Sequence, residues 1–119
     1  MLFRSVMALN NLAWVLAKLK RPGAVVFAER AQAIAPNDAA IKDTLAFVLV
    51  QEGKMDLALV AAKAALVLSP EEPVYRLSVA RLLLKSGDKP AARRELEPLL
   101  KLGTLFDRHK EVAELFGKL

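Results

Sequence analysis

The feature of this sequence that most limits its fold is an internal repeat. When the chain is shifted on itself by 34 positions, Gly53 falls on Gly87, and Pro70 falls on Pro36 in the other direction. Alanines and leucines between these positions coincide as well. A fixed period in this range is typical of a stacked array, in which each unit buries its apolar face against the next unit. The chain is therefore predicted to be a repeat protein.

Each unit of the repeat predicts two helices. Leu45 and Leu49 begin an apolar stripe with helical spacing, and Gly53 ends that helix because glycine readily adopts the left-handed conformation after a last turn. A second stripe consists of alanines three or four residues apart, and Pro70 closes the unit because proline cannot continue a helix interior. Small alanine side chains allow two antiparallel helices to approach closely. The unit is therefore predicted to be a helical hairpin.

Seven helices follow from these patterns. They are expected near residues 4–19, 23–35, 38–52, 55–68, 72–86, 89–102 and 107–118. Asp88 and Asp107 are expected to cap the sixth and seventh helices. Pro98 lies inside the sixth helix and predicts a kink or break between Arg94 and Leu99. The seventh helix is not a repeat, and its apolar stripe suits it to cover the exposed end of the array.

Composition agrees with an all-α fold. The chain has 119 residues, enough for one domain, and it is 55% hydrophobic but only 6% aromatic. A core of Ala, Leu and Val fits close-packed helices better than a β-sandwich, which favours β-branched and aromatic residues. There is no cysteine, which excludes disulfides, a thiolate nucleophile and cysteine-ligated zinc.

The residues that recur in each unit resemble a known family. The period, the Leu45–Ala46 pair, Gly53, Ala58, Ala65 and Pro70 together resemble a tetratricopeptide repeat (TPR). The resemblance implies an all-α, right-handed superhelical array of antiparallel helix pairs that forms a single domain over residues 1–119. Its units would span about 5–37, 38–71 and 72–104, followed by a capping helix at about 107–118.

The first and third units depart from the family pattern. The first unit is one residue short, and Lys20 stands near the position of its turn glycine, so Pro22–Gly23 is expected to take over the turn. Thr104 stands where the third unit would end in proline. The packing pattern persists despite these changes.

A narrower resemblance concerns two sequence segments in the first half of the chain. The segment NNLAWVLAKLKRPGAVVFAERAQAIAPND, followed by DTLAFVLVQEG, is similar to the C-terminal repeats of bacterial TPR proteins linked to PEP-CTERM and exosortase exopolysaccharide systems. This resemblance implies a role in bacterial exopolysaccharide export or protein sorting. It would place the chain in the periplasm or cell envelope, and without it the cytoplasm is expected.

The sequence offers no catalytic constellation. His109 is the only histidine and stands between Arg108 and Lys110, and the glycines form no phosphate-binding loop. The pair Glu71–Glu72 lies at an inter-repeat turn. We therefore expect no enzyme, no cofactor and no metal site.

Charge and hydropathy bear on the partners. The net charge is +5, but Lys and Arg are spread along the chain, so nucleic-acid binding is not expected. No apolar run reaches the roughly 18 residues that a membrane span needs, and the N-terminus lacks the pattern of a signal peptide. A protein or peptide partner of unknown identity is expected instead.

The TPR resemblance implies where a partner would bind, because the first helix of each unit lines the concave surface in that family. The expected groove residues are Asn10, Trp14, Lys18, Asp43, Phe47, Val50, Gln51, Leu77, Arg81, Leu84 and Lys85. Helical spacing groups them into ladders. Trp14 and Phe47 would supply apolar contact area, and Arg81 and Lys85 would favour a helix or extended segment with one acidic end. In the alternative interpretation, the two aromatic residues pack on neighbouring helices and the charges are merely solvated.

A second function class is structural assembly. The first unit would expose apolar residues that normally meet a preceding repeat, with Leu9, Val25 and Val26 as candidates. A contiguous apolar patch favours association. The chain is therefore expected either to form homo-oligomers or to be the C-terminal piece of a longer array.

Overall fold

The computed structural model describes residues 2–119, and side chains from residue 5 onward. The described residues form seven α-helices and one 3-10 turn, without a strand. In chain order they are α1 (Leu2–Lys18), α2 (Ala24–Ile34), α3 (Ala39–Gln51), α4 (Met55–Leu68), α5 (Pro73–Lys85), α6 (Lys89–Leu102), η1 (Gly103–Leu105) and α7 (His109–Phe116). The predicted helices are confirmed, and each end lies within two residues of the expected position.

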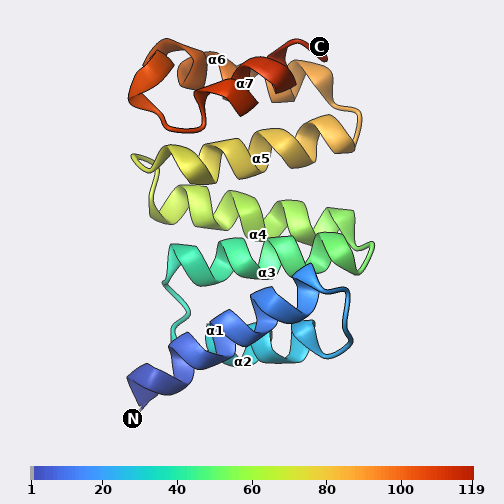
Figure 1. Ribbon diagram of the computed structural model, residues 1–119, viewed down its shortest axis with the longest axis vertical. Coiled ribbons are helices and arrows are strands. Elements are labelled where there is room, and N and C mark those ends of the chain that lie inside the picture. Colours follow the sequence, from blue (N-terminus) through green and yellow to red (C-terminus); the bar gives the residue numbers. More distant parts are fainter. Residues whose placement is uncertain (1) are drawn as a thin grey trace.

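The helices stack as consecutive antiparallel pairs, α1 with α2, α3 with α4, and α5 with α6 (Figure 1). The array is elongated, with extents of 42 × 27 × 21 Å. The first helices of the pairs are not evenly spaced. The backbones of α1 and α3 pack directly on one another, whereas those of α3 and α5 hardly approach along their length. This unequal spacing leaves room between α3 and α5.

The turn inside each pair has the same backbone conformation and the same hydrogen bond to the preceding helix. Gly53 and Gly87 have φ angles of 77° and 88°, in the left-handed region that glycine tolerates, and Lys20 takes the equivalent position with a φ of 56°. The next N–H after each of them donates to a carbonyl of the preceding helix: Arg21 to Leu16 at 2.8 Å, Lys54 to Leu49 at 2.9 Å, and Asp88 to Leu83 at 3.0 Å. The expectation that Pro22–Gly23 replaces the turn glycine is therefore corrected, because Lys20 itself adopts the strained conformation.

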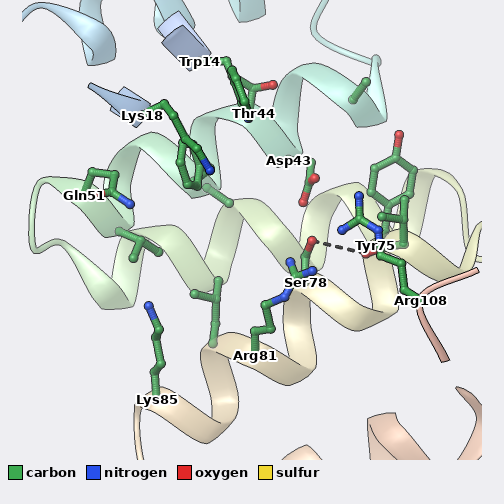
Figure 2. Close-up of a pocket in the computed structure, with 16 residues that line it drawn as sticks. Trp14, Lys18, Asp43, Thr44, Gln51, Tyr75, Ser78, Arg81, Lys85 and Arg108 are labelled. Carbon is green, nitrogen blue, oxygen red and sulfur yellow. Dashed lines mark hydrogen bonds between the residues drawn. The ribbon is translucent and has the colours of Figure 1, made fainter. Parts of the chain in front are cut away.

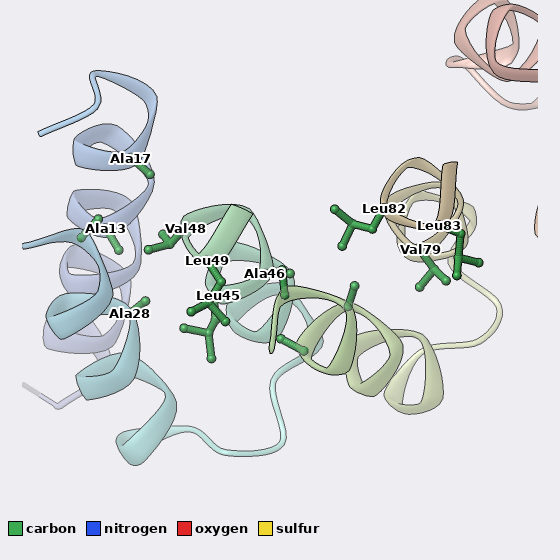
Figure 3. Packing of buried hydrophobic residues seen from close by; sticks show 14 of the residues in the cluster. Ala13, Ala17, Ala28, Leu45, Ala46, Val48, Leu49, Val79, Leu82 and Leu83 are labelled. Carbon is green, nitrogen blue, oxygen red and sulfur yellow. The ribbon is translucent and has the colours of Figure 1, made fainter. Parts of the chain in front are cut away.

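Alanines form much of the core between the pairs. Ala13, Ala28, Ala58 and Ala62 are completely buried and belong to one cluster that runs from α1 to α6. Figure 3 shows part of this cluster, with Ala13 and Ala28 beside residues of α3. A second cluster lies at the C-terminal end and joins α5, α6 and α7. Its buried members are Leu77, Ala80, Leu96, Leu99, Phe106 and Val112. The last helix therefore covers the end of the array, as its stripe predicted.

One prediction about a helix break is contradicted, and one about a helix cap is wrong. The break that was one of the two outcomes expected near Pro98 does not occur, since α6 continues through it, whereas a kink there stays a prediction. Pro98 lies on the exposed side of α6, while Leu96 and Leu99 are buried on the other side and hold the helix in place. Asp107 does not cap α7, because that helix begins at His109 and receives no side-chain cap. Asp88 does cap α6, and its carboxylate accepts a hydrogen bond from the Ala91 N–H at 3.2 Å.

The expected apolar outer face of the first pair is present only in part. Val26 is exposed, but Leu9 and Val25 are half-buried, and Val25 packs against the core. Among the described side chains, the large apolar residues exposed on α1 are instead Met7, Leu12, Trp14 and Val15, and Leu19 is exposed directly after the end of α1. Within residues 2–119, no helix combines the length and the hydropathy that crossing a membrane requires.

Candidate functional site

A cavity of about 660 Å³ opens along α1, α3 and α5 (Figure 2). Its volume lies within the usual range for ligand-binding clefts. The space exists because α3 and α5 do not pack closely on one another, whereas α1 and α3 do. One further residue, Arg108, reaches the cavity from the segment that precedes α7.

Most of the residues expected in the groove do line this cavity. They are Trp14, Lys18, Asp43, Phe47, Val50, Gln51, Arg81 and Lys85. The other three do not. Leu77 is completely buried in the C-terminal core cluster, Leu84 packs half-buried against the larger cluster, and Asn10 is half-buried with its Oδ1 atom enclosed and unpaired.

The burial of Leu77 has a physical reason. Asn10, Asp43 and Leu77 occupy equivalent positions in the three pairs, but their helices have different neighbours. Asp43 on α3 faces the gap before α5, whereas Leu77 on α5 faces α6 and α7. Identical register in a repeat therefore leads to different environments, because the array ends after α5 and α6.

The centre of the cavity is aromatic. Trp14 and Phe47 are equivalent residues of adjacent pairs, and their rings stack with centroids 6.0 Å apart and an interplanar angle of 27°. The Lys18 Nζ atom lies 5.5 Å from the centroid of the Trp14 ring. Trp14 remains 45% exposed, so the stacked pair leaves a large aromatic surface uncovered.

One end of the cavity is basic. Lys18, Gln51 and Lys85 lie at the C-terminal ends of α1, α3 and α5, at equivalent positions of the three pairs. All three side chains are exposed. Among the residues that the structure describes, neither lysine takes part in an ion pair. Negative charge is favoured near two such ammonium groups.

The opposite end contains the carboxylate of Asp43, which points from α3 toward Ser78 on α5 (Figure 2). Burial raises the pKa of Asp43, while the Ser78 hydroxyl and the positive charges of Arg81 and Arg108 act to lower it. The Ser78 hydroxyl also lies 3.2 Å from the carbonyl oxygen of Val74. It has a single proton, so it serves one acceptor at a time.

Arg81 is not the free cation that the sequence suggested. Its guanidinium donates to both carboxylate oxygens of Glu111 on α7, with Nη2 to Oε1 at 3.0 Å. These hydrogen bonds lower the pKa of Glu111, chiefly because they stabilise its charged form. Arg81 has no acidic neighbour in sequence, and its counter-ion lies 30 positions further along the chain. The basic character at the Gln51 end of the groove therefore rests on Lys18 and Lys85, and Arg108 adds a positive charge near Asp43.

Several lining residues were missed. They are Ala40, Thr44, Ala46, Val74, Tyr75, Ser78, Leu82 and Arg108. Helical spacing could have predicted Val74 and Ser78, because they lie on the same face of their helix as Arg81 and Lys85. Ala40 and Thr44 are the equivalent residues one repeat earlier. No local pattern places Arg108 in the cavity, since it arrives from the segment before α7.

The remaining polar candidates have local roles. The His109 Nδ1–H donates to the carbonyl oxygen of Phe106 at 2.9 Å and thereby ties the start of α7 to η1. In the part of the chain that the structure describes, His, Asp and Glu side chains nowhere gather into a group suited to a metal ion.

Comparison with known proteins identifies the fold. No protein-family model matches the sequence, and no curated protein is similar enough to match it. The crystal structure of the type III secretion chaperone SycD of Yersinia enterocolitica, in complex with a peptide of the translocator YopD, matches this chain with a TM-score of 0.82 at 18% sequence identity. The match covers 97% of this chain and 92% of the chaperone chain. The fold is TPR-like. The TPR-like fold confirms the predicted fold class, and it places the cavity on the face formed by the first helices of the pairs.

Proposed function

We propose that this chain is a non-catalytic scaffold that binds a peptide or helix of a protein partner in the cavity along α1, α3 and α5. The observation that carries the proposal is the stacked pair of Trp14 and Phe47, which presents exposed aromatic surface inside a cavity of about 660 Å³. Aromatic residues in such a position commonly dominate the energy of protein binding. The likeness to a chaperone that was solved with a bound peptide supports the same kind of partner.

The charge of the cavity indicates the chemistry of that partner. Lys18 and Lys85 at one end would attract an acidic residue, and the aromatic centre would accommodate an apolar one. An amphipathic helix or an extended segment with an apolar stripe and one acidic end meets both requirements.

Binding of displayed peptides tests this proposal. Peptides selected from a random library on the wild-type protein should contain an apolar residue and a nearby acid, and their binding should alter the fluorescence of Trp14, the only tryptophan. Phe47→Ala should weaken binding by about 2 kcal/mol, roughly thirty-fold. Val67→Ala is the control, because Val67 is 79% exposed on α4 and lies outside the cavity. Equal binding by both variants would reject the cavity as the site.

The narrower resemblance adds a biological setting, in which the scaffold would act in bacterial exopolysaccharide export or protein sorting. This setting stands on the sequence resemblance alone. Genes for polysaccharide export or for an exosortase beside the coding gene would support it, and their absence would remove its basis.

Self-association is a second candidate function, favoured by exposed apolar residues on α1 and in the turn directly after it. Met7, Val15 and Leu19 are 57%, 43% and 63% exposed, and surfaces of this kind tend to find partners. Light scattering at micromolar concentration tests the idea. The wild type should show a mass greater than that of one chain. The double variant Val15→Ser with Leu19→Ser should show the mass of a single chain. A monomeric wild type would contradict this function.

A further inference from the structure

The Asp43 end of the cavity has a property that an apolar and acidic ligand does not explain. Among the described residues, ion pairs join Arg76 to Glu95 and Arg81 to Glu111, and none includes Asp43. The nearby Ser78 hydroxyl acts to lower the pKa of Asp43, but its single proton is donated to the Val74 carbonyl oxygen at 3.2 Å. Asp43 is thus a half-buried carboxylate that faces a cavity without an ionic partner.

Neither of the nearby positive charges forms an ion pair with Asp43 among the described residues. The Arg81 guanidinium is neutralised by Glu111. Arg108 is exposed at the rim, where its charge influences Asp43 without forming an ion pair. A segment that lies across the cavity would cover Asp43 and remove its remaining water. A buried carboxylate without a cation is strongly disfavoured. A ligand that fills the cavity is therefore favoured when it brings a positive charge to this end.

We propose that Asp43 is a specificity-determining subsite that binds a lysine or arginine side chain of the bound segment. This inference rests on the proposed peptide-binding function and deepens it. The cavity then binds three kinds of ligand side chain in order: a cation at Asp43, an apolar residue on Trp14 and Phe47, and an acid at Lys18 and Lys85.

The spacing of the two charged ends constrains the ligand. Asp43 and Gln51 lie on the same helix, eight residues apart, which corresponds to roughly 12 Å along its axis. An extended chain covers that distance in about four residues. The cation and the acid of an extended ligand should therefore be separated by about four positions, with the apolar residue between them.

Parallel selections from a random phage-displayed peptide library test the subsite. The wild type should enrich Lys or Arg about four positions from an acidic residue, and Asp43→Asn should lose that enrichment while retaining the apolar anchor. Asp56→Asn is the matched control, because it makes the same chemical change on the exposed surface of α4, outside the cavity. It should select the same peptides as the wild type.

A double-mutant cycle then measures the contact. One enriched peptide is synthesised with its cationic residue and with norleucine in its place, and binding is followed by the fluorescence of Trp14. The replacement should weaken binding to the wild type about tenfold, and it should change binding to Asp43→Asn less than about twofold. The thermal transition of Asp43→Asn should remain cooperative, so that a loss of selection reflects the subsite.

The outcomes separate the two proposals. Peptides that need Phe47 but show the same Lys and Arg content on the wild type and Asp43→Asn would overturn the subsite and leave the groove intact. Enrichment of Ser, Thr or Asn, instead of Lys or Arg, at the peptide position that contacts Asp43 would also contradict the proposal of a cationic ligand. If no peptide depends on Phe47, the proposed function itself fails.

Discussion

Replacing Phe106 by alanine tests whether the C-terminal cap stabilises the array and supports the cavity. Phe106 is 7% exposed and packs in the cluster formed by α5, α6 and α7. It directly precedes the segment that carries Arg108 to the cavity and Glu111 to Arg81. The substitution should therefore loosen both the end of the array and the Asp43 end of the cavity.

The magnitude follows from the burial of the ring. Truncation of a buried phenylalanine to alanine costs about 3–5 kcal/mol, and the lower value applies here because a terminal helix can partly relax into the space. Unfolding a chain of this length involves an entropy of about 0.25 kcal/mol per kelvin, so a loss of about 3 kcal/mol lowers Tm by about 12 °C.

Urea titration and thermal melting followed by circular dichroism measure the loss. Leu105→Ala is the control, because Leu105 is the preceding residue but is 88% exposed. It should change the free energy of unfolding by less than about 0.5 kcal/mol. Hydrogen exchange should locate the effect, since the stability of a repeat array is approximately local. Protection should fall in α6 and α7 and persist in α1 and α2.

Two results would refute this reasoning. Equal destabilisation by Phe106→Ala and Leu105→Ala would mean that the ring is not part of the core. Uniform loss of protection from α1 to α7 would mean that the array unfolds as one unit and that the cap has no local role.

Two further predictions concern a turn and an ion pair. Lys20→Gly should raise the free energy of unfolding by about 1 kcal/mol in urea titration, because Lys20 has a φ of 56° that glycine adopts without strain; a loss of stability would contradict the reading of the turn. The Arg81–Glu111 pair lowers the pKa of Glu111, so its contribution is present above about pH 4.5 and is lost as the pH falls through the lowered value. That contribution is below about 1 kcal/mol because both side chains are about one third exposed. Glu111→Gln should remove this part of the pH dependence of Tm, whereas the exposed Glu114→Gln should preserve it; identical profiles for the two variants would exclude the effect.

The helices and their order could be predicted because their signals are local. The 34-residue period, the turn glycines Gly53 and Gly87 and the alanine stripes act within one or two helices. The break expected at Pro98 shows the limit of local rules. The buried neighbours Leu96 and Leu99 keep α6 continuous through a residue that disfavours a helix interior.

The composition of the cavity could be predicted only in part. Trp14, Phe47 and Lys85 were expected in the groove because the TPR resemblance implies that the first helix of each unit lines it, and the structure locates them in the cavity. Leu77 was assigned to the same surface by its register, yet it is buried. Register specifies the face of a helix, but the neighbour that covers the face depends on the position of the helix in the array.

The sequence by itself determined the stacked helical hairpins, because periodicity, turn conformation and small core residues act over short distances along the chain. Only the tertiary structure decided the charge of the cavity. Packing of α7 brings Glu111 onto Arg81 and Arg108 to the rim, while Asp43 remains without an ionic partner among the described residues. Electrostatic interactions depend on distance in space, and these groups lie far apart in sequence.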